Sequence, residues 1–434
     1  MSMKKTISFI LAAVSFIGFA LAGILPVSAA DEPQFTGAKS AYVYNLDNEK
    51  AVYAYQDDET VYPTSTVKIM TGILALEALS DRLDETVTVT AEMLSEATGN
   101  NIGLKAGEQL TVRDLIGATL VNGANDAAYV LAYTVSGSAS AFVQRMNARA
   151  AELGAHNTRY TNPTGIHNDN MVTTAKDTCI IALHAYHMDG FMDFASALSW
   201  TIKATNLKPV RTLYNRNCLL SLYYEKDYYY KKARGMNAGS TFEGGYCVVT
   251  TATDGDLTYL AVVMDADSID GTIYSYINAK NLLEWAFESF VYLDVLSPDQ
   301  TVCEIPVTLA TGIDYVTLVS KDTLSVFLPS DTDISEEISL SWTMESEELQ
   351  APIQKGQTVG RVTAMYNDEP IGTADLIATV DISRSDVLYG LYKIGQFTKS
   401  RFFIAALVSA VVLSVVYVFG TAYLRQRRKN SRYR

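Results

Sequence analysis

Basic residues are scarce in the middle of this chain. Its 434 residues include 34 Lys and Arg against 48 Asp and Glu. Eight of the basic residues fall within the first 30 and the last ten positions, where no acid occurs, so the middle holds 26 basic against 48 acidic groups and a net charge of about −22. Such a surface repels phosphate backbones, because nucleic-acid affinity comes largely from Lys and Arg that neutralise phosphates. Nucleic-acid binding is therefore excluded.

The long apolar runs lie at the two ends. Two lysines precede an uncharged run from Ile7 to Leu25, and small residues follow up to Ala30. This order is typical of a secretory signal peptide, which we predict to span residues 1–30. An uncleaved anchor helix is the alternative, because the run is long for a signal.

At the other end, residues 402–424 contain no charge. A helix rising about 1.5 Å per residue over this stretch spans the roughly 30 Å apolar core of a bilayer, which predicts a transmembrane helix. A buried core helix fits less well, because residues 408–417 offer no polar face. The basic tail 425–434 should remain in the cytoplasm, so residues 31–400 are predicted to lie outside, in a single-pass membrane protein.

Cysteine is also rare, with four residues in the whole chain. Exported proteins meet oxidising conditions, but so few cysteines in so long a chain do not make a disulfide framework. We expect Cys179, Cys218, Cys247 and Cys303 to be mostly free, buried thiols.

Residues 31–296 combine strand and helix patterns. The strand patterns occur at 42–44, 52–55, 245–251 and 257–265, and the helical patterns at 69–76, 111–133, 140–153, 174–186 and 278–290. The first two strands predict a hairpin. Strands at both ends that enclose a helical middle predict an α/β domain in which the first and last strands share a sheet.

From residue 297 the composition changes to short alternating runs. These runs lie at 302–307, 339–342, 355–366 and 371–377. The last two are separated by a turn and predict a second hairpin. We therefore predict a small all-β domain over residues 297–387, followed by a stalk over residues 388–401.

One short motif combines a nucleophile and a base. Ser65 and Lys68 are three residues apart, just after Pro63 and at the start of the helical pattern. Proline suits a helix start, and a spacing of three places both side chains on one helical face, where the lysine amine can take the hydroxyl proton. The helix start also offers free backbone N–H groups where an oxyanion forms. Ser-x-x-Lys occurs by chance about once or twice in a chain this long, so the motif needs its context.

That context resembles the serine-type D-alanyl-D-alanine carboxypeptidases, the low-molecular-mass penicillin-binding proteins of bacteria. The similar segments are Tyr62–Met70, Leu104–Glu108, Asn125–Ala128, Asn162–His167, Arg211–Asn215 and Glu243–Cys247. The resemblance implies a penicillin-recognising, β-lactamase- and transpeptidase-like α/β (α+β) domain, a small β domain and a membrane anchor. It also implies hydrolysis of peptidoglycan stem peptides on the outer side of a bacterial membrane, β-lactams as covalent ligands, and no cofactor or metal.

The resemblance assigns roles to individual residues. Ser65 forms the acyl-enzyme, Lys68 is the general base and Asn125 positions the substrate amide. The backbone N–H groups of Ser65 and Ser240 are the expected oxyanion donors, and backbone donors do not depend on side-chain identity. This makes an acylation core that is complete in its nucleophile, its base and its oxyanion donors.

Two family motifs depart from their usual form. Where the family has Ser-x-Asn, this chain has Gly123, Ala124 and Asn125, so a proton-relaying hydroxyl is missing. Where the family has Lys-Thr-Gly, which holds the substrate carboxylate, this chain has Asn237, Ala238 and Gly239.

Without the lysine and threonine that hold the substrate carboxylate, we expect selectivity for that substrate to fall about tenfold to a hundredfold. The lost lysine charge also leads us to expect that Lys68 is a poorer base near neutral pH. Two alternatives to a working carboxypeptidase follow. One is a catalytically weak protein that binds peptidoglycan as a scaffold or sensor. The other is a serine hydrolase whose substrate lacks a free carboxylate.

For several other residues the sequence indicates a functional role less strongly. Lys231, Lys232 and Arg234 could replace the lost positive charge, but we expect them to be solvated. The tyrosines at 223, 224 and 228–230 either flank a groove for a glycan-linked peptide or pack between strands. His184 and His187 lack a nearby carboxylate pair, so no metal site is expected, and His167 is expected in a loop.

Overall fold

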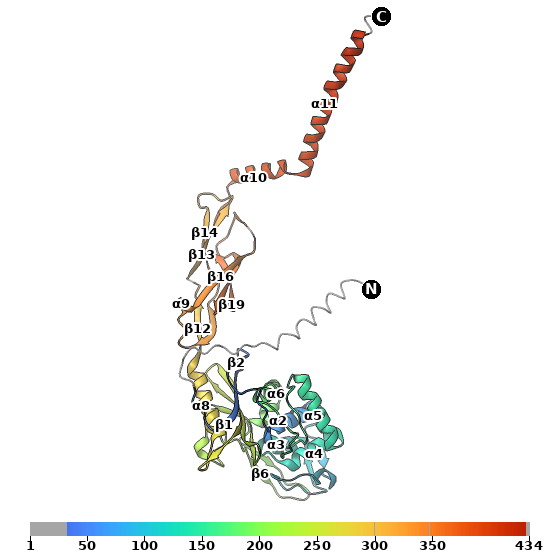
Figure 1. Cartoon of the computed structure of the whole chain (residues 1–434), viewed down its shortest axis with the longest axis vertical. Helices are drawn as coiled ribbons and strands as arrows, with labels where there is room; N and C mark the ends of the chain where they lie inside the picture. Colours follow the sequence, from blue (N-terminus) through green and yellow to red (C-terminus); the bar gives the residue numbers. More distant parts are fainter. Residues whose placement is uncertain (1–32, 299, 347, 431–434) are drawn as a thin grey trace. The chain divides into compact units, whose positions relative to one another are not determined.

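The computed structural model describes residues 33–298, 300–346 and 348–430 (Figure 1). These form two compact units: the chain up to Val291 together with Pro329–Asp331, and Tyr292–Leu328 together with the chain from Thr332 onward. The predicted signal peptide and residues 431–434 of the predicted tail lie outside the described residues.

The first unit is built on an antiparallel sheet of five strands. Its strands are β1 (Ala38–Asn45), β2 (Lys50–Tyr55), β7 (Ala233–Thr241), β8 (Gly245–Asp254) and β9 (Leu257–Ala266), in the order β2-β1-β9-β8-β7. The prediction that the first and last strands share a sheet is confirmed, because Val43 of β1 lies opposite Ala261 of β9. Strand β7 forms one edge of the sheet.

Helices cover both faces of this sheet (Figure 1). Helix α8 (Tyr274–Ser289) packs on one face. The helices of the other layer are α2 (Val67–Leu79), α3 (Val112–Val121), α4 (Asn125–Ser136), α5 (Ala139–Leu153), α6 (Ala175–His187) and α7 (Phe191–Ala195). Most side chains of α2 are buried, so α2 runs through the middle of its layer.

The helical pattern predicted at 111–133 is interrupted. Helix α3 ends at Val121 and α4 begins at Asn125. Between them Gly123 has a φ of 69°, which glycine adopts without the steric cost of a Cβ atom. The chain therefore turns sharply where the second motif lies.

Helix α8, the last helix of the first unit, begins four residues earlier than predicted.

Short elements complete the first unit. They are η1 (Thr64–Thr66), η2 (Ser80–Arg82), η3 (Glu92–Leu94), η4 (Lys226–Tyr228), β3 (Thr86–Thr88), β4 (Gln109–Thr111), β5 (Ser199–Ile202), β6 (Arg211–Tyr214), β10 (Ser268–Ile269) and β11 (Thr272–Ile273). Strands β3 and β4, β5 and β6, and β10 and β11 form two-stranded antiparallel pairs.

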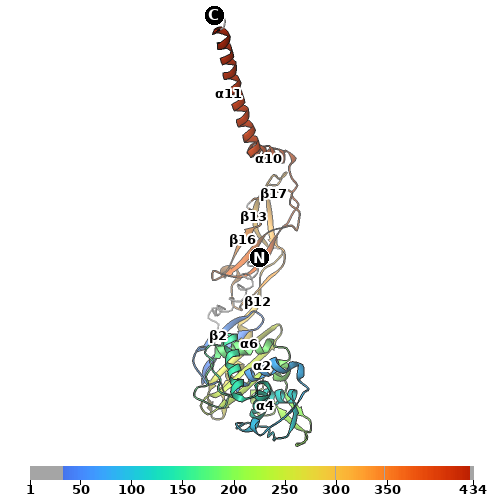
Figure 2. The same cartoon turned by 90° about the vertical axis from the view of Figure 1, so that its right-hand side faces the viewer.

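The second unit is rich in strands, as the alternating pattern predicts (Figure 2). A six-stranded sheet has the order β16-β18-β19-β14-β13-β17, and β12 pairs with β15. The elements are β12 (Phe290–Leu296), β13 (Thr301–Thr308), β14 (Tyr315–Ser320), β15 (Leu324–Pro329), α9 (Ile334–Glu337), β16 (Ile338–Met344), β17 (Leu349–Gln350), β18 (Thr358–Tyr366) and β19 (Glu369–Ala378). The predicted second hairpin is confirmed as β18 and β19.

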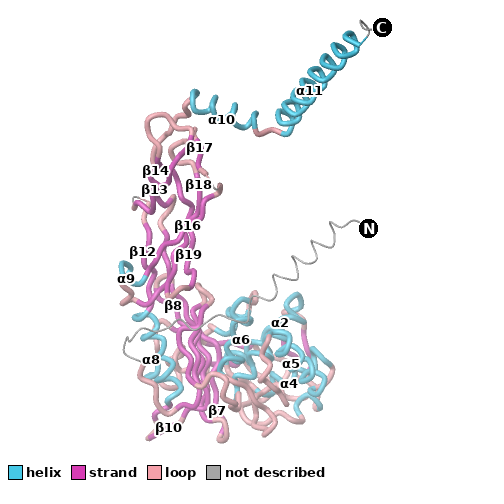
Figure 3. Tube along the Cα trace, turned by 45° about the horizontal axis from the view of Figure 1, so that its top comes forward, coloured by secondary structure: helices cyan, strands magenta, loops and turns pink. Residues whose placement is uncertain are grey.

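Two helices follow these strands (Figure 3). Helix α10 (Asp386–Thr398) occupies most of the segment predicted as a stalk, and its apolar side chains, such as Val387 and Leu391, are exposed. Helix α11 (Arg401–Asn430) contains the predicted membrane span. Among the described residues, Arg401–Gln426 is the single helical stretch that is long and apolar enough to cross a bilayer.

The prediction for the cysteines is confirmed. Cys179, Cys218, Cys247 and Cys303 are all free and buried. Burial raises the pKa of the Cys247 thiol to about 11, so this thiol stays protonated and unreactive at neutral pH.

Candidate active site

Ser65 lies in the short helical turn η1, directly before α2. Pro63 precedes this turn with a φ of −71°, as expected for a proline at a helix start. The loop around Gly165 packs tightly against the turn, and a Cβ atom at Gly165 would lie 1.7 Å from the Thr64 carbonyl oxygen. Only glycine fits there. Ser65 itself is half-buried, so this residue remains partly accessible to solvent.

Lys68 is buried in the first turn of α2, with 1% of its surface exposed. Its Nζ lies 3.4 Å from Ser65 Oγ and donates a hydrogen bond to the Thr164 carbonyl oxygen at 2.6 Å. Burial and, to a smaller extent, the nearby positive charge of Arg216 together lower the pKa of Lys68 to about 7. Burial rather than a third-motif lysine is the main cause of the lowered pKa, and the expectation that the loss of the motif lysine weakens this base stays a prediction.

The Thr164 carbonyl is a contact to Lys68 that sequence reasoning missed. Asn162 shapes its loop: Asn162 Oδ1 accepts hydrogen bonds from the backbone N–H groups of Thr164 and Gly165, and Nδ2 donates to the Ile166 carbonyl. The family-like segment 162–167 was visible in the sequence. Its contact with Lys68 was not, because 96 residues separate Lys68 from Thr164.

The second motif lies at the start of α4, against the loop of residues 98–101. The backbone N–H of Asn125 donates to the Asn100 carbonyl at 2.7 Å, and Asn125 Nδ2 donates to the Thr98 carbonyl at 2.6 Å. Asn100 Nδ2 donates in turn to the carbonyl of Gly123 at 3.0 Å. Asn125 Oδ1 is buried and has no hydrogen-bond partner among the described residues, so it is free to accept a hydrogen bond from a ligand.

The third motif lies on the edge strand β7, next to the serine. A Cβ atom at Gly239 would lie 2.4 Å from Ser65 Cβ and 2.6 Å from Ser65 Oγ, so the strand and the serine touch only because residue 239 is glycine. Asn237 and Ala238 are buried beside it, and Ser240 is exposed. Within the described part of the chain, Asn237 Oδ1 is a buried atom without a partner.

Arg216 is a second residue that sequence reasoning missed. Its backbone N–H donates to the Val121 carbonyl, and its Nη1 donates to Asn100 Oδ1 at 3.3 Å. Its Cδ lies 3.9 Å from the position of a Cβ atom at Gly123, and its guanidinium carbon lies 5.2 Å from the centre of the Tyr224 ring. Arg216 directly follows the family-like segment 211–215, and this was its only signal in the sequence.

The other candidates lie elsewhere or have structural partners. Lys232 pairs with Asp254 at 2.7 Å, so it does not replace the lost lysine. His184 contacts Glu77 and Arg149 at the protein surface. No group of three His, Cys, Asp or Glu that could hold a metal ion occurs among the residues that the structure describes.

His167 lies in a loop, as expected. Its Nε2 lies 3.0 Å from Asp169 Oδ1, and its ring packs edge-on against Tyr62. Tyr228 and Tyr230 are buried, whereas Tyr223, Tyr224 and Tyr229 are exposed, so the predicted tyrosine cluster divides between packing and surface.

A five-stranded antiparallel sheet, helices on both of its faces and a serine–lysine pair beside its edge strand define the class of the penicillin-binding, transpeptidase-like proteins. Comparison with known proteins agrees with this class. Residues 27–268 match the D-alanyl-D-alanine carboxypeptidase family model, and residues 290–384 match the model of the C-terminal domain of penicillin-binding protein 5. The chain belongs to the D-alanyl-D-alanine carboxypeptidase family.

Individual relatives cover most of the chain. The D-alanyl-D-alanine carboxypeptidase DacF of Bacillus subtilis is 26% identical over 92% of this chain and 100% of its own length. The D-alanyl-D-alanine carboxypeptidase DacC of Escherichia coli is 30% identical over 75% of this chain and 79% of its own length. The crystal structure of penicillin-binding protein 5 from Haemophilus influenzae matches 82% of this chain and all of its own, with a TM-score of 0.59 and 26% identity.

Proposed function

We propose that this protein is a membrane-anchored serine hydrolase that acts on peptidoglycan stem peptides ending in D-alanyl-D-alanine. One observation carries the proposal. A buried lysine with a pKa lowered to about 7 lies 3.4 Å from the hydroxyl of a half-buried serine. A base of this pKa is partly neutral at pH 7, which is the state needed to accept the serine proton.

The reaction has two steps. Lys68 accepts the proton of Ser65, whose Oγ bonds to the carbonyl carbon of the penultimate D-alanine. The amide C–N bond breaks, and the leaving amine takes the proton from Lys68. Water then attacks the resulting ester with Lys68 again as the base, which releases the shortened stem peptide and restores the Ser65 hydroxyl.

The oxyanion of each step is assigned to the backbone N–H groups of Ser65 and Ser240. The close approach of β7 to Ser65 at Gly239 supports this assignment, because it brings the next residue of the strand to the carbonyl position. Donors fixed by the backbone before the reaction stabilise the charge without reorganisation. Both donors are backbone groups, so the changed side chains of the second and third motifs do not affect this assignment.

Substrate contacts are assigned to five further residues. The unpartnered Asn125 Oδ1 supports a role in accepting an N–H from the substrate peptide. Gly123 has no side chain where the family has a serine, and a Cβ atom there would lie 3.7 Å from Asn100 Nδ2. Asn237 offers one neutral hydrogen bond, and Ala238 and Gly239 offer backbone only. A carboxylate is therefore held less tightly here than by a charged lysine.

The proposed location at the membrane rests on the apolar helix α11 and on the basic tail that follows it. Helix α11 supports anchoring through a single membrane span, and β-lactams are the expected covalent ligands of Ser65. The basic residues of the tail favour its retention in the cytoplasm, which supports a serine on the outer side with the peptidoglycan.

Two measurements test the proposal. The full chain in detergent is incubated with a fluorescent penicillin and analysed by intact mass and peptide mapping, with Ser65→Ala as the control. We expect a penicilloyl adduct on Ser65 and none on the variant. In parallel, release of D-alanine from a stem pentapeptide is measured. No adduct and no release would favour the scaffold or sensor, and an adduct without release would favour a hydrolase with another substrate.

A further inference from the structure

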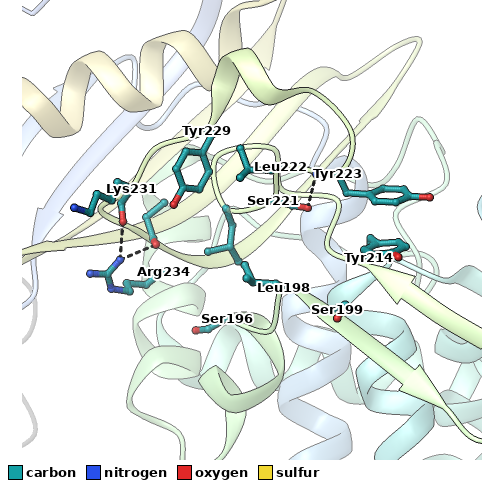
Figure 4. A pocket seen from close by; sticks show the side chains of 12 residues that line it. Ser196, Leu198, Ser199, Tyr214, Ser221, Leu222, Tyr223, Tyr229, Lys231 and Arg234 are labelled. Carbon is teal, nitrogen blue, oxygen red and sulfur yellow. Dashed lines mark hydrogen bonds between the residues drawn. The ribbon is translucent and has the colours of Figure 1, made fainter.

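A concave surface separate from the serine–lysine pair opens beside the start of β7 (Figure 4). This tyrosine cleft has a volume of about 590 Å³. Its lining residues are Ser196, Leu198, Ser199, Tyr214, Leu220, Ser221, Leu222, Tyr223, Tyr229, Lys231, Ala233 and Arg234. None of them belongs to the three motifs, and the proposed reaction does not use their side chains.

An aromatic platform forms one end of the tyrosine cleft. The rings of Tyr214 and Tyr223 stack face to face, with centres 3.6 Å apart and planes 7° from parallel. Because 57% of Tyr223 is exposed, much of its flat ring is open to solvent. The backbone N–H of Tyr223 donates to Ser221 Oγ at 3.3 Å, which helps to fix the platform. A ligand that stacks on a fixed tyrosine loses little binding free energy to the ordering of side chains.

The side chains around this platform suit a saccharide. One face of a pyranose ring carries C–H groups that pack on an aromatic ring, while its hydroxyl groups form hydrogen bonds at the rim. The cleft offers both kinds of contact. Leu198 and Leu222 are exposed beside the rings, and the hydroxyl side chains of Ser196, Ser199 and Tyr229 line the walls.

Positive charge lies at the other end of the cleft. Figure 4 shows Lys231 and Arg234 away from the stacked rings, with Leu198 and Leu222 between them. Arg234 Nη1 donates to the carbonyls of Lys231 and Ala233, and a guanidinium has five N–H donors, so donors remain for a ligand. None of the described residues that line the cleft is acidic. In a chain of net charge −14, this end of the cleft favours a ligand that carries carboxylates.

The tyrosine cleft adjoins the catalytic site. Arg234 lies three residues before Asn237 on β7, a separation of roughly 10 Å at the usual rise of a strand. On the other wall, the carbonyl of Tyr214 accepts a hydrogen bond from Asn122 Nδ2 at 3.3 Å, and Asn122 is the neighbour of Gly123. A ligand in the cleft would therefore lie next to a stem peptide bound at the catalytic serine.

We infer that the tyrosine cleft is a saccharide-binding site for a strand of N-acetylated sugars that carry carboxylates, as the glycan of peptidoglycan does. The strand is bound without a covalent step. Binding it keeps the catalytic serine close to the stems of the same polymer, because a second binding event on a linked ligand profits from a raised effective concentration. This benefit for catalysis rests on the proposed function, whereas saccharide binding itself needs neither Ser65 nor Lys68.

Binding is measured directly on the full-length Ser65→Ala protein in detergent, which cannot form the acyl-enzyme. The probes are peptide-free glycan strands, whose lactyl groups are free carboxylates, and neutral chitooligosaccharides of the same length. Isothermal titration calorimetry gives the dissociation constants. We expect saturable binding of both probes, with the carboxylate-bearing strand bound about tenfold more tightly. The absence of saturable binding of either probe at millimolar concentration would overturn the inference.

Variants locate the binding within the tyrosine cleft. Tyr223→Ser removes the exposed ring, so the affinity for both probes should fall about tenfold. Arg234→Gln removes a charge, so the affinity for the carboxylate-bearing strand should fall about fivefold and that for the neutral probe should not change. Tyr315→Ser and Arg361→Gln, at exposed positions of the strand-rich unit, are matched controls that should bind as the Ser65→Ala parent does. Thermal unfolding shows that each variant is folded, and equal affinities in folded cleft variants and controls would contradict the inference.

A peptide is the other occupant to be tested. A soluble stem pentapeptide without sugars is added as a competitor to the titration with glycan strands. We expect the apparent dissociation constant of the strand to stay the same. Displacement of the strand by the pentapeptide would show that the cleft takes a peptide and would overturn the inference.

The cleft and the catalytic serine give separate outcomes. Saccharide binding without a penicillin adduct on Ser65 would support the cleft and contradict the proposed hydrolase. A penicillin adduct without saccharide binding would support the hydrolase and contradict the cleft alone.

Discussion

The carbonyl oxygen of Thr164 lies 2.6 Å from Nζ of Lys68, closer than the Ser65 hydroxyl at 3.4 Å. A carbonyl only accepts hydrogen bonds, so it binds an N–H of Lys68 whether or not the amine is protonated. It fixes the amine without competing for its lone pair. In the neutral state the lone pair remains available to the serine proton.

Acylation of Ser65 should depend on pH through the protonation of Lys68. Because the pKa of Lys68 is lowered to about 7, the rate of penicillin acylation should rise about tenfold per pH unit below pH 7 and level off above it. Stopped-flow fluorescence with a labelled penicillin measures this profile. A rise that continues to pH 10 would show that Lys68 is not the base or that its pKa is not lowered.

The stability of the fold should also depend on pH through Lys68. The unfolded chain keeps the ordinary lysine pKa of 10.5, so between pH 7 and 10.5 it binds a proton that the folded chain lacks, and stability rises with pH in that window. The cost of the buried amine is fully present below pH 7. Lys68→Met should therefore stabilise the protein by roughly 2 kcal/mol at pH 6, after the loss of the Thr164 hydrogen bond, and the gain should shrink toward pH 10. Thermal unfolding at several pH values tests this, and a gain that grows with pH would contradict it.

Arg216 should influence Lys68 through its charge. Arg216→Gln removes a positive charge that disfavours protonated Lys68, so the acylation profile should move to higher pH by a few tenths of a unit. Because Arg216 is exposed, the difference from wild type should diminish in 1 M salt. Asn237→Lys should move the profile in the opposite direction. The same labelling assay applies, and equal profiles in all three proteins would rule out this coupling.

Asn162 should be needed to hold the Thr164 carbonyl. Asn162→Ala removes three hydrogen bonds to the backbone of its loop, so the amine of Lys68 loses its fixed partner. We expect acylation to slow by about tenfold to a hundredfold, in line with a misplaced base. Asn281→Ala, which removes one exposed hydrogen bond to Gln34, is the control and should acylate at the wild-type rate. A normal rate in Asn162→Ala would argue against the role of the loop.

Gly239 should be essential for a steric reason. In Gly239→Ala the new Cβ would meet Ser65 Cβ at 2.4 Å, so either β7 or the serine must move and acylation should fall by at least a hundredfold. Gly255→Ala is the contrast, because Gly255 has a φ of 57° but open space around it. It should cost about 1 kcal/mol in unfolding free energy and leave acylation intact. Acylation rates and chemical denaturation separate the two effects.

Local pattern predicted most elements of the fold. The spacing of Ile69, Met70 and Ile73 indicated α2, and the alternation after residue 297 indicated the strands of the second unit. The interruption at Gly123 was not predicted, because apolar spacing continues on both sides of it. The pattern records which residues are buried and not where the backbone must turn.

The sequence by itself determined the pairing of Ser65 with Lys68, because a spacing of three fixes two side chains on one helical face whatever surrounds them. The protonation of Lys68, the loop that holds its amine and the approach of Gly239 were decided only by the tertiary structure. Each depends on residues brought together over 90 or more positions, such as Lys68 with Thr164 and Ser65 with Gly239, and burial by distant segments has no signature in local spacing. The changed third motif predicted a poorer base, whereas the burial that lowers the pKa of Lys68 to about 7 has no signal in local spacing.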